Sequence, residues 1–310
     1  MPAYPPHQRG KLIEAYFYDF YLHHQASFPP ESVYLPVFWT DYYLNHDYGR
    51  RPLRRLQEFL DRSIVPGKRY FTVIQHVDGI LNYLPPDTVI TFAAGGTGDI
   101  PIPLLCDAHP TVEQPRDVFA SFIGMPTHFC RRQLHEVARD NPDFRIVETD
   151  DIAKTLPVFE DLMNRSLFAL CPRGHGTTSF RLYEALQMGS IPVYPFDDLW
   201  LPYTQELNWR RFSVLVHISE IRFLPDILRT IDHQTITAMQ AAVREVHAAY
   251  FTLEACARWI LKTLQIISRE GFRPDFKGRS VHESRFMSLW TSANLGYLRR
   301  QPQGQDREDL

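Results

Sequence analysis

The residues best placed to do chemistry lie at positions 173–193, which read RGHGTTSFRLYEALQMGSIPV. A predicted buried strand ends just before them, and Gly174 and Gly176 let the following turn approach another group closely. Ser179 is a candidate N-cap for a short helix that Gly189 is expected to end. The N-terminus of a helix after such a turn is a place where an anion can bind.

Two charged side chains on this helix define the chemistry it could perform. Arg181 lies near the helix N-terminus, where a positive charge is disfavoured unless an anion such as phosphate is bound there. Glu184 follows one turn later, and its carboxylate can accept two hydrogen bonds from a ribose diol. The spacing also fits a simpler arrangement, in which Arg181 and Glu184 only pair with each other on a solvated helix surface. The stretch therefore indicates either a nucleotide site or an ordinary ion pair.

The composition limits the class of protein. The chain has 310 residues, of which 44% are hydrophobic and 22% charged, so it can bury a substantial core in one large or two medium domains. A net charge of −3 argues against a dominant role in binding nucleic acid. The sequence has no run of 18 apolar residues and no signal-peptide pattern, so we expect a soluble, cytoplasmic protein. A membrane-anchored protein trimmed of its anchor would have the same sequence.

Metal and disulfide chemistry have little support in the sequence. No CxxC, HExxH or DxD motif occurs, so we expect no metal ion. The four cysteines are widely spaced and are expected to be free, mostly buried thiols: Cys106, Cys130, Cys171 and Cys256.

Short apolar runs alternate with helical patterns along most of the chain, which is typical of an α/β fold with parallel sheets. Nine runs are predicted as strands: Ile13–Tyr18, Val33–Trp39, Tyr70–Gln75, Val89–Ala93, Val118–Ile123, Phe144–Val147, Leu167–Leu170, Ile191–Tyr194 and Phe212–Val216. Helices are predicted between them and near the end: Asp41–Arg62, His128–Arg139, Ile152–Asn164, Thr178–Met188 and Leu253–Ile267.

A proline-rich segment, residues 99–117, separates the strands into two groups. Its four prolines argue against a helix or a central strand, so we expect a linker between two α/β domains. The predicted organisation is a first domain of residues 1–112, a second of 113–255, a helical extension of 256–298 and a disordered tail of 299–310.

The chain resembles exostosin-type glycosyltransferases of the GT47 family at many points, over about residues 12 to 265. Around the stretch described first, the matching positions are Pro172-Arg173-Gly174, Ser179, Arg181, Glu184-Ala185, Gly189, Ile191-Pro192-Val193 and Leu201-Pro202. Elsewhere they are Ala15–Asp19, Val33–Phe38, Arg69–His76 with Asp78-Gly79, Asp99–Pro103, and Phe122–Gly124 with Arg131 and Leu134.

The resemblance implies a GT-B fold, in which two Rossmann-like domains face a central cleft and the last helices cross back to the first domain. The nucleotide-sugar donor would sit mainly on the second domain and the acceptor mainly on the first. Plainer roles stay open for several donor residues, such as helix cap, exposed loop histidine or solvated helix charge. The implied donor residues are Glu184 for the ribose, Arg181 and Arg173 for the phosphates, and Ser179, His175, Arg131 and Gly124 around them.

The resemblance also implies an inverting mechanism. Retaining enzymes of this fold often carry a second glutamate eight residues before the ribose-binding one, and Gly176 occupies that position here. A single displacement needs a general base near the acceptor hydroxyl, and it needs stabilisation of the departing diphosphate, which arginines can supply without metal. The base is expected in a first-domain loop after a strand, with Asp78 as first choice and then Asp41 and His76. Each of these three could instead cap a loop or hold a core hydrogen bond.

The leading hypothesis is therefore an inverting transferase that moves a sugar from a nucleotide diphosphate, expected to be UDP, to a hydroxyl of a glycan or glycolipid, with no cofactor. The alternative is a catalytically weak relative that binds donor or glycan within a glycosyltransferase complex. A Rossmann oxidoreductase or epimerase is disfavoured, because no GxGxxG follows the first strand. A homodimer stays open, and neither the sugar nor the linkage is predicted.

Overall fold

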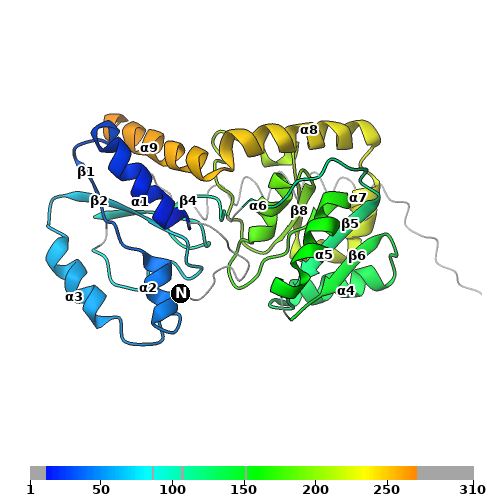
Figure 1. The fold of residues 1–310 in the computed structure, drawn as a ribbon, viewed down its shortest axis with the longest axis horizontal. Helices are drawn as coiled ribbons and strands as arrows, with labels where there is room; N and C mark the ends of the chain where they lie inside the picture. Colours follow the sequence, from blue (N-terminus) through cyan, green and yellow to red (C-terminus); the bar gives the residue numbers. More distant parts are fainter. Residues whose placement is uncertain (1–11, 86, 106–107, 151, 271–310) are drawn as a thin grey trace, which may run out of the picture. The chain divides into compact units, whose positions relative to one another are not determined.

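Two parallel β-sheets organise the part of the chain that the structure describes. This computed structural model describes residues 12–85, 87–105, 108–150 and 152–270 (Figure 1). The first sheet has the order β1-β2-β3-β4 and consists of β1 (Ser32–Tyr34), β2 (Arg69–Ile74), β3 (Val89–Ala93) and β4 (Ile100–Pro101). The second has the order β6-β5-β7-β8-β9 and consists of β5 (Val118–Gly124), β6 (Phe144–Glu148), β7 (Ser166–Leu170), β8 (Ile191–Phe196) and β9 (Val214–His217). All neighbouring strands in both sheets are parallel.

The second sheet contains all five strands predicted from Val118 onward, with ends that shift by at most two residues. Their continuous apolar runs are buried because helices pack on the sheet, and Phe122, Phe168 and Leu134 are among the core side chains. The helical segments that follow these strands are α4 (Phe129–Arg139), α5 (Ile152–Arg165), α6 (Phe180–Gln187), η2 (Trp209–Arg211), η3 (Ile218–Phe223), α7 (Leu224–Arg229), α8 (His233–Tyr250) and α9 (Leu253–Glu270).

The first predicted strand, Ile13–Tyr18, is wrong, because these residues begin the helix α1 (Ile13–His24). Aromatic residues favour strands, and they suggested one here. The buried side chains nevertheless follow a helical period, since Ile13, Phe17 and Phe20 recur at spacings of four and three. A short 3₁₀ turn, η1 (Gln25–Ser27), ends the helix.

Two further predictions in the first half need correction. The predicted strand Val33–Trp39 ends at Tyr34, and its last residue begins α2 (Trp39–Asn45). The predicted helix Asp41–Arg62 is two helices, because residues 47 to 49 all have positive φ and end α2. The chain becomes helical again only after Pro52, in α3 (Arg54–Ser63).

The proline-rich linker contributes one short strand at the edge of the first sheet. Residues Ile100–Pro101 form the edge strand β4, which pairs with β3. Proline has no backbone N–H to donate. It is tolerated in an edge strand, because no further strand lies beside it to accept a hydrogen bond.

Arg116 fastens the far end of the linker to the second half. Its guanidinium donates to the carbonyls of Ser166 at 2.6 Å and Met188 at 2.7 Å, and to Ser190 Oγ at 2.8 Å. Gly189, the predicted stop of α6, has φ +76, and a Cβ there would lie 2.9 Å from Arg116. Arg116 of the linker therefore packs closely against the end of α6.

The last described helix returns to the first half. Figure 1 shows α9, in orange, beside α1, in blue, and Gln265 Nε2 on α9 donates to the carbonyl of Ser27 at 2.9 Å. Trp259 packs edge-on against Phe92 of β3, with ring centres 6.5 Å apart. Two parallel α/β halves with a returning helix confirm the predicted GT-B architecture. The predicted tail, residues 271–298 of the predicted extension and Cys106 lie outside the described residues.

A buried carboxylate joins three elements of the first half. Glu14 on α1 is 2% exposed and accepts hydrogen bonds from the hydroxyl of Thr40 at 2.6 Å and from the backbone N–H of Gln75 at 2.8 Å. The N–H of Thr40 also donates to it, at 3.1 Å. Burial raises the pKa of Glu14 to about 7, and the hydrogen bonds oppose this shift only in part.

Glu14 should make the stability of the protein depend on pH. Because its pKa is raised in the folded state, the folded protein holds the proton more tightly than the unfolded chain does. Its stabilising contribution is present below about pH 4.5 and is lost as the pH rises through 7. At 1.36 kcal/mol per pKa unit, the loss is at most about 3 kcal/mol.

The variant Glu14→Gln should flatten this dependence when free energies of unfolding are measured by urea denaturation between pH 4.5 and 7.5. The exposed Glu136→Gln serves as the control and should keep the wild-type slope. Equal slopes for wild type and Glu14→Gln would contradict the assignment.

Candidate functional site

The candidate donor residues gather where the strand order of the second sheet reverses. The chain forms β5, adds β6 on one side and then β7 on the other, so the connections from β5 and β7 leave in opposite directions. In open parallel sheets, ligands bind at this point, at the carboxyl ends of the strands. β5 ends at Gly124 and β7 at Leu170, and the chain after them carries Arg131 on α4 and residues 173–184.

Ser179 and two charged residues form the start of α6. Ser179 is the N-cap, and its Oγ accepts a hydrogen bond from the N–H of Arg181 at 3.3 Å. Arg181 Nε donates to Glu184 Oε2 at 3.0 Å. The two side chains are 13% and 2% exposed, so the ion pair that the spacing allowed is present but is buried rather than solvated. A buried pair is stable only when further groups satisfy its remaining donors and acceptors.

Arg181 lies between two aromatic rings and keeps an unused donor. Its Cζ atom is 4.3 Å from the ring centre of Phe159 and 5.6 Å from that of Phe122. Its Nη1 atom is buried and has no hydrogen-bond partner among the described residues. Such a donor carries a desolvation penalty that an anionic acceptor would remove.

Two hydroxyl groups in the loops before α4 and α6 also lack a hydrogen-bond partner among the described residues. Thr127 Oγ1, before α4, and Thr177 Oγ1, before α6, are buried without a partner in the described part of the chain. The loops meet here, since a Cβ at Gly174 would lie 3.8 Å from Thr127 Oγ1 and 3.2 Å from Arg131 Nη2. A Cβ at Gly124 would lie 3.3 Å from Arg131 Nη1, so both glycines leave room for this arginine. Sequence reasoning missed Thr127, which belongs to no motif.

A histidine from the linker is also a partner of Glu184. His109 Nε2 lies 3.4 Å from Glu184 Oε1, and His109 Nδ1 lies 3.1 Å from Glu160 Oε1 on α5. Burial alone would lower the pKa of His109, but the two carboxylates hold this pKa above its ordinary value. Sequence reasoning missed His109 and Glu160, because both are distant from Glu184 along the chain and neither carries a local signal.

Arg131 connects the loop after β5 with the loop after β7. Its guanidinium donates to the carbonyls of Arg173 at 2.9 Å, Met125 at 2.8 Å and Pro172 at 3.3 Å. Burial, aided by the nearby charge of Arg181, lowers the pKa of Arg131 to about 10, so it stays charged at neutral pH. It is therefore not a solvated helix charge.

Arg173 has its charge compensated within the site. Its Nη1 atom donates to both carboxylate oxygens of Asp197, at 2.8 and 2.7 Å, and its Nε atom donates to the carbonyl of Gly176 at 3.0 Å. Burial would raise the pKa of Asp197, but the contacts with Arg173 lower it. His175, in the same loop, is exposed.

Glycines bring the loop after β7 against the first half. A Cβ at Gly176 would overlap Val77 Cγ2 and would come 2.5 Å from the carbonyl oxygen of Gly95. Gly96 has φ +113, and a Cβ there would overlap Thr177 Oγ1. Gly176, which stands where retaining enzymes often carry a second glutamate, thus also has a steric reason to be a glycine.

The three residues predicted as general base occupy different settings. Asp78, in the loop after β2, has a side chain that is 60% exposed. His76 is buried, which lowers its pKa, and its Nδ1 atom accepts a hydrogen bond from the N–H of Asp78 at 3.3 Å. A neutral ring in this arrangement carries its proton on Nε2, which makes Nε2 a donor rather than a base. Asp41 lies inside α2, so its predicted position in a loop is wrong.

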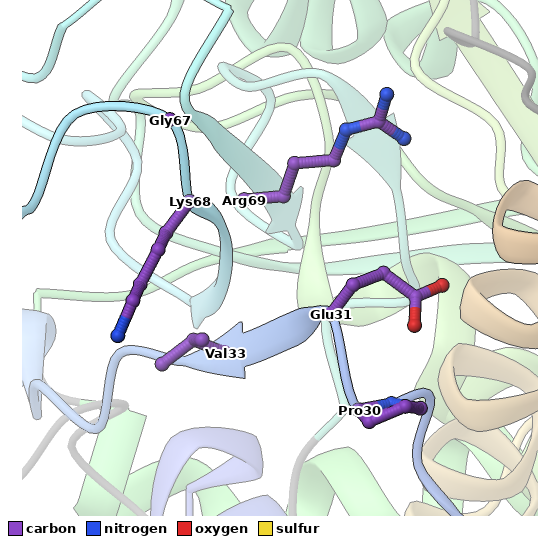
Figure 2. A pocket seen from close by; sticks show the side chains of 6 residues that line it. All are labelled: Pro30, Glu31, Val33, Gly67, Lys68 and Arg69. Carbon is purple, nitrogen blue, oxygen red and sulfur yellow. The ribbon is translucent and has the colours of Figure 1, made fainter.

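A surface hollow lies at the other end of the first sheet. It is formed where β1 and β2 begin, and in Figure 2 the side chain of Lys68 points away from those of Glu31 and Arg69. Ligands of parallel sheets bind at the carboxyl ends of the strands, so this hollow is not the candidate site. Its lining residues are Pro30, Glu31, Val33, Gly67, Lys68 and Arg69.

The described ranges support neither a metal site nor a membrane-spanning helix. No group of three or more His, Cys, Asp or Glu side chains within them could hold a metal ion. None of the helices described is both long and apolar enough to cross a bilayer. Cys130, Cys171 and Cys256 are buried free thiols, as predicted.

The contact at Gly176 predicts a loss of stability in Gly176→Ala. The new Cβ would force Val77 and the carbonyl of Gly95 to move, which should lower the free energy of unfolding by about 1–3 kcal/mol. The neighbouring Gly174→Ala is the control and should lose less, because its nearest atom, Arg131 Nη2, is 3.2 Å away. Urea denaturation compares the two, and equal losses would argue against the contact.

Comparisons with known proteins agree with this geometry. Residues 91–231 match the family model described as the Exostosin GT47 domain. "Probable glucuronosyltransferase 47 A" of Physcomitrium patens is 33% identical over 140 residues, which cover 41% of this chain and 30% of that protein. "Probable glucuronosyltransferase GUT1" of Oryza sativa subsp. japonica is 29% identical over 218 residues, which cover 64% and 49%.

A third relative comes from an animal. "Exostosin-1 homolog" of Caenorhabditis elegans is 24% identical over 213 residues, which cover 58% of this chain and 53% of that protein. The matched residues thus span between 30% and 53% of the length of these relatives. The matched region contains β5 to β9 and the whole motif around Glu184. Within residues 91–231, the chain is therefore similar to the exostosin GT47 family.

Proposed function

We propose that this chain is an inverting glycosyltransferase that moves a sugar from a UDP-linked donor to a hydroxyl of a glycan or glycolipid, without a metal ion. The observation that carries the proposal is the buried pair of Arg181 and Glu184 at the reversal point of the second sheet. Two relatives are named glucuronosyltransferases, which supports a sugar-transfer reaction.

The donor would be held by groups that already converge at the start of α6. Glu184, which contacts Arg181 and His109, would accept hydrogen bonds from the ribose diol, because a carboxylate offers about four lone-pair sites. The unused Nη1 donor of Arg181 and the hydroxyls of Thr127 and Thr177 are suited to diphosphate oxygens.

The reaction would be one displacement at the anomeric carbon. The acceptor oxygen forms the new bond to that carbon as the bond to the diphosphate oxygen breaks, and the acceptor proton passes to a base. Negative charge grows on the departing diphosphate, where a buried guanidinium stabilises it more strongly than water would. Asp78 is the proposed base, since it is exposed and lies after β2, at the carboxyl end of the first sheet.

Replacing the ribose ligand should weaken use of the donor. Glu184→Gln removes a charged acceptor, so kcat/KM for release of UDP from UDP-sugars should fall about 10- to 100-fold. The exposed Glu136→Gln is the matched control and should match wild type. If Glu184→Gln keeps full activity, Glu184 is not the ribose ligand.

The same assay tests the finer points of the proposal. A panel of UDP-sugars identifies the donor, and NMR of the product reports whether the anomeric configuration inverts. Activity that survives a chelator supports a metal-independent reaction, whereas full loss that Mg²⁺ restores would overturn that part.

Removal of the base should act on chemistry rather than on binding. Asp78→Asn should lower kcat about 10²- to 10⁴-fold and leave the affinity for UDP unchanged. Asp61→Asn, on the surface of α3 in the first half, is the control. An unchanged kcat in Asp78→Asn would exclude Asp78 as the base.

One observation favours a second candidate function, a catalytically weak partner that binds donor or glycan within a glycosyltransferase complex. Of the three predicted bases, His76 presents a donor and Asp41 lies within a helix, so Asp78 is the sole remaining candidate among them. Saturable binding of UDP without turnover of any UDP-sugar and acceptor pair would support this alternative.

A further inference from the structure

His109 belongs to the linker but is built into the second half. Its backbone N–H donates to Gln187 Oε1 on α6 at 3.2 Å, and its ring meets Phe159 of α5 edge-on, with ring centres 5.2 Å apart. The side chain is 5% exposed. His109 is therefore held in place by α5 and α6, the two helices that carry its charged neighbours.

Both ring nitrogens of His109 face carboxylates. Nδ1 is 3.1 Å from Glu160 Oε1, and Nε2 is 3.4 Å from Glu184 Oε1. A neutral imidazole has one N–H and one lone pair, so it would direct a lone pair at one of the two carboxylates. Only the protonated ring can donate to both carboxylates, of which Glu160 lies on α5, and Glu184, itself paired with Arg181, lies on α6.

The contact determines how Glu184 is held. Its Oε2 atom accepts from Arg181, which lies on the same helix and approaches from one side, while its Oε1 atom faces His109. With both partners in place, the plane of the carboxylate has a fixed orientation. Loss of the charge on His109 would weaken the contact at Oε1 and would hold the orientation of the carboxylate less firmly.

We propose that His109, supported by Glu160, is a positioning residue that orients the Glu184 carboxylate for the donor ribose. The inference rests on the proposed function, because it assigns Glu184 to the ribose. The pKa of His109 agrees with it: burial lowers this pKa, and the two carboxylates more than offset that effect. Binding of UDP should therefore be tight when His109 is protonated and should weaken as the pH rises through the pKa of His109.

The test measures the Kd of UDP by calorimetry between pH 5.5 and 8.5. His109→Gln keeps one amide donor but cannot carry the charge, so it should bind UDP about tenfold more weakly than wild type at low pH. The ratio of the two Kd values should approach one above the pKa of His109. Ionisation of the UDP phosphate affects both proteins equally, so the ratio removes it. His233→Gln, an exposed histidine at the start of α8, should follow wild type.

Glu160→Gln provides a second variant that leaves His109 and Glu184 intact. Loss of the Glu160 charge should lower the pKa of His109, so the change in Kd should move to lower pH, and NMR titration of the His109 ring should shift in the same direction. A ratio that does not depend on pH, or a Glu160→Gln profile equal to wild type, overturns the positioning role. A wild-type protein that binds no UDP at any pH overturns the proposed function instead, and the inference with it.

Discussion

Charge buried at the carboxyl end of the second sheet is the constraint on which the candidate site depends. Glu184 is 2% exposed, and an ionised carboxylate in such a place needs charged donors around it. Arg181 supplies one from the same helix and His109 supplies another from the linker, while Glu160 supports His109. The group combines three segments of the chain, so the site forms only when the linker is docked on α5 and α6.

The loops that would hold the donor also join the two halves. Gly176 and Thr177 contact Val77, Gly95 and Gly96 of the first half. The same few residues therefore have to satisfy both the packing between the halves and the binding of the donor. Further along the chain, Trp200 is buried among first-half side chains and donates to the carbonyl of Ala93 at 3.2 Å. A change in the contact between the halves would therefore reach the donor loop directly.

Prediction from the sequence succeeded where the local pattern and the tertiary environment agree. The strands β7 and β8 of the second sheet are buried on both faces, so their continuous apolar runs identify them without reference to partners. It failed in Ile13–Tyr18, where aromatic residues that favour strands are placed at a helical spacing, and in Asp41–Arg62, where three residues of positive φ interrupt an apparent helix. In both cases a local preference was outweighed by packing or by backbone conformation.

The sequence by itself determined the two groups of strands, the proline-rich linker between them, and the cap, arginine and glutamate of α6, because these depend on spacings of a few residues. Only the tertiary structure decided the partners of those side chains. Whether Arg181 and Glu184 lie in water or in the interior depends on Phe122 and Phe159, and the second partner of Glu184 is His109. Such contacts join residues that are distant along the chain, and the energy of a charge is determined by the groups that surround it in space.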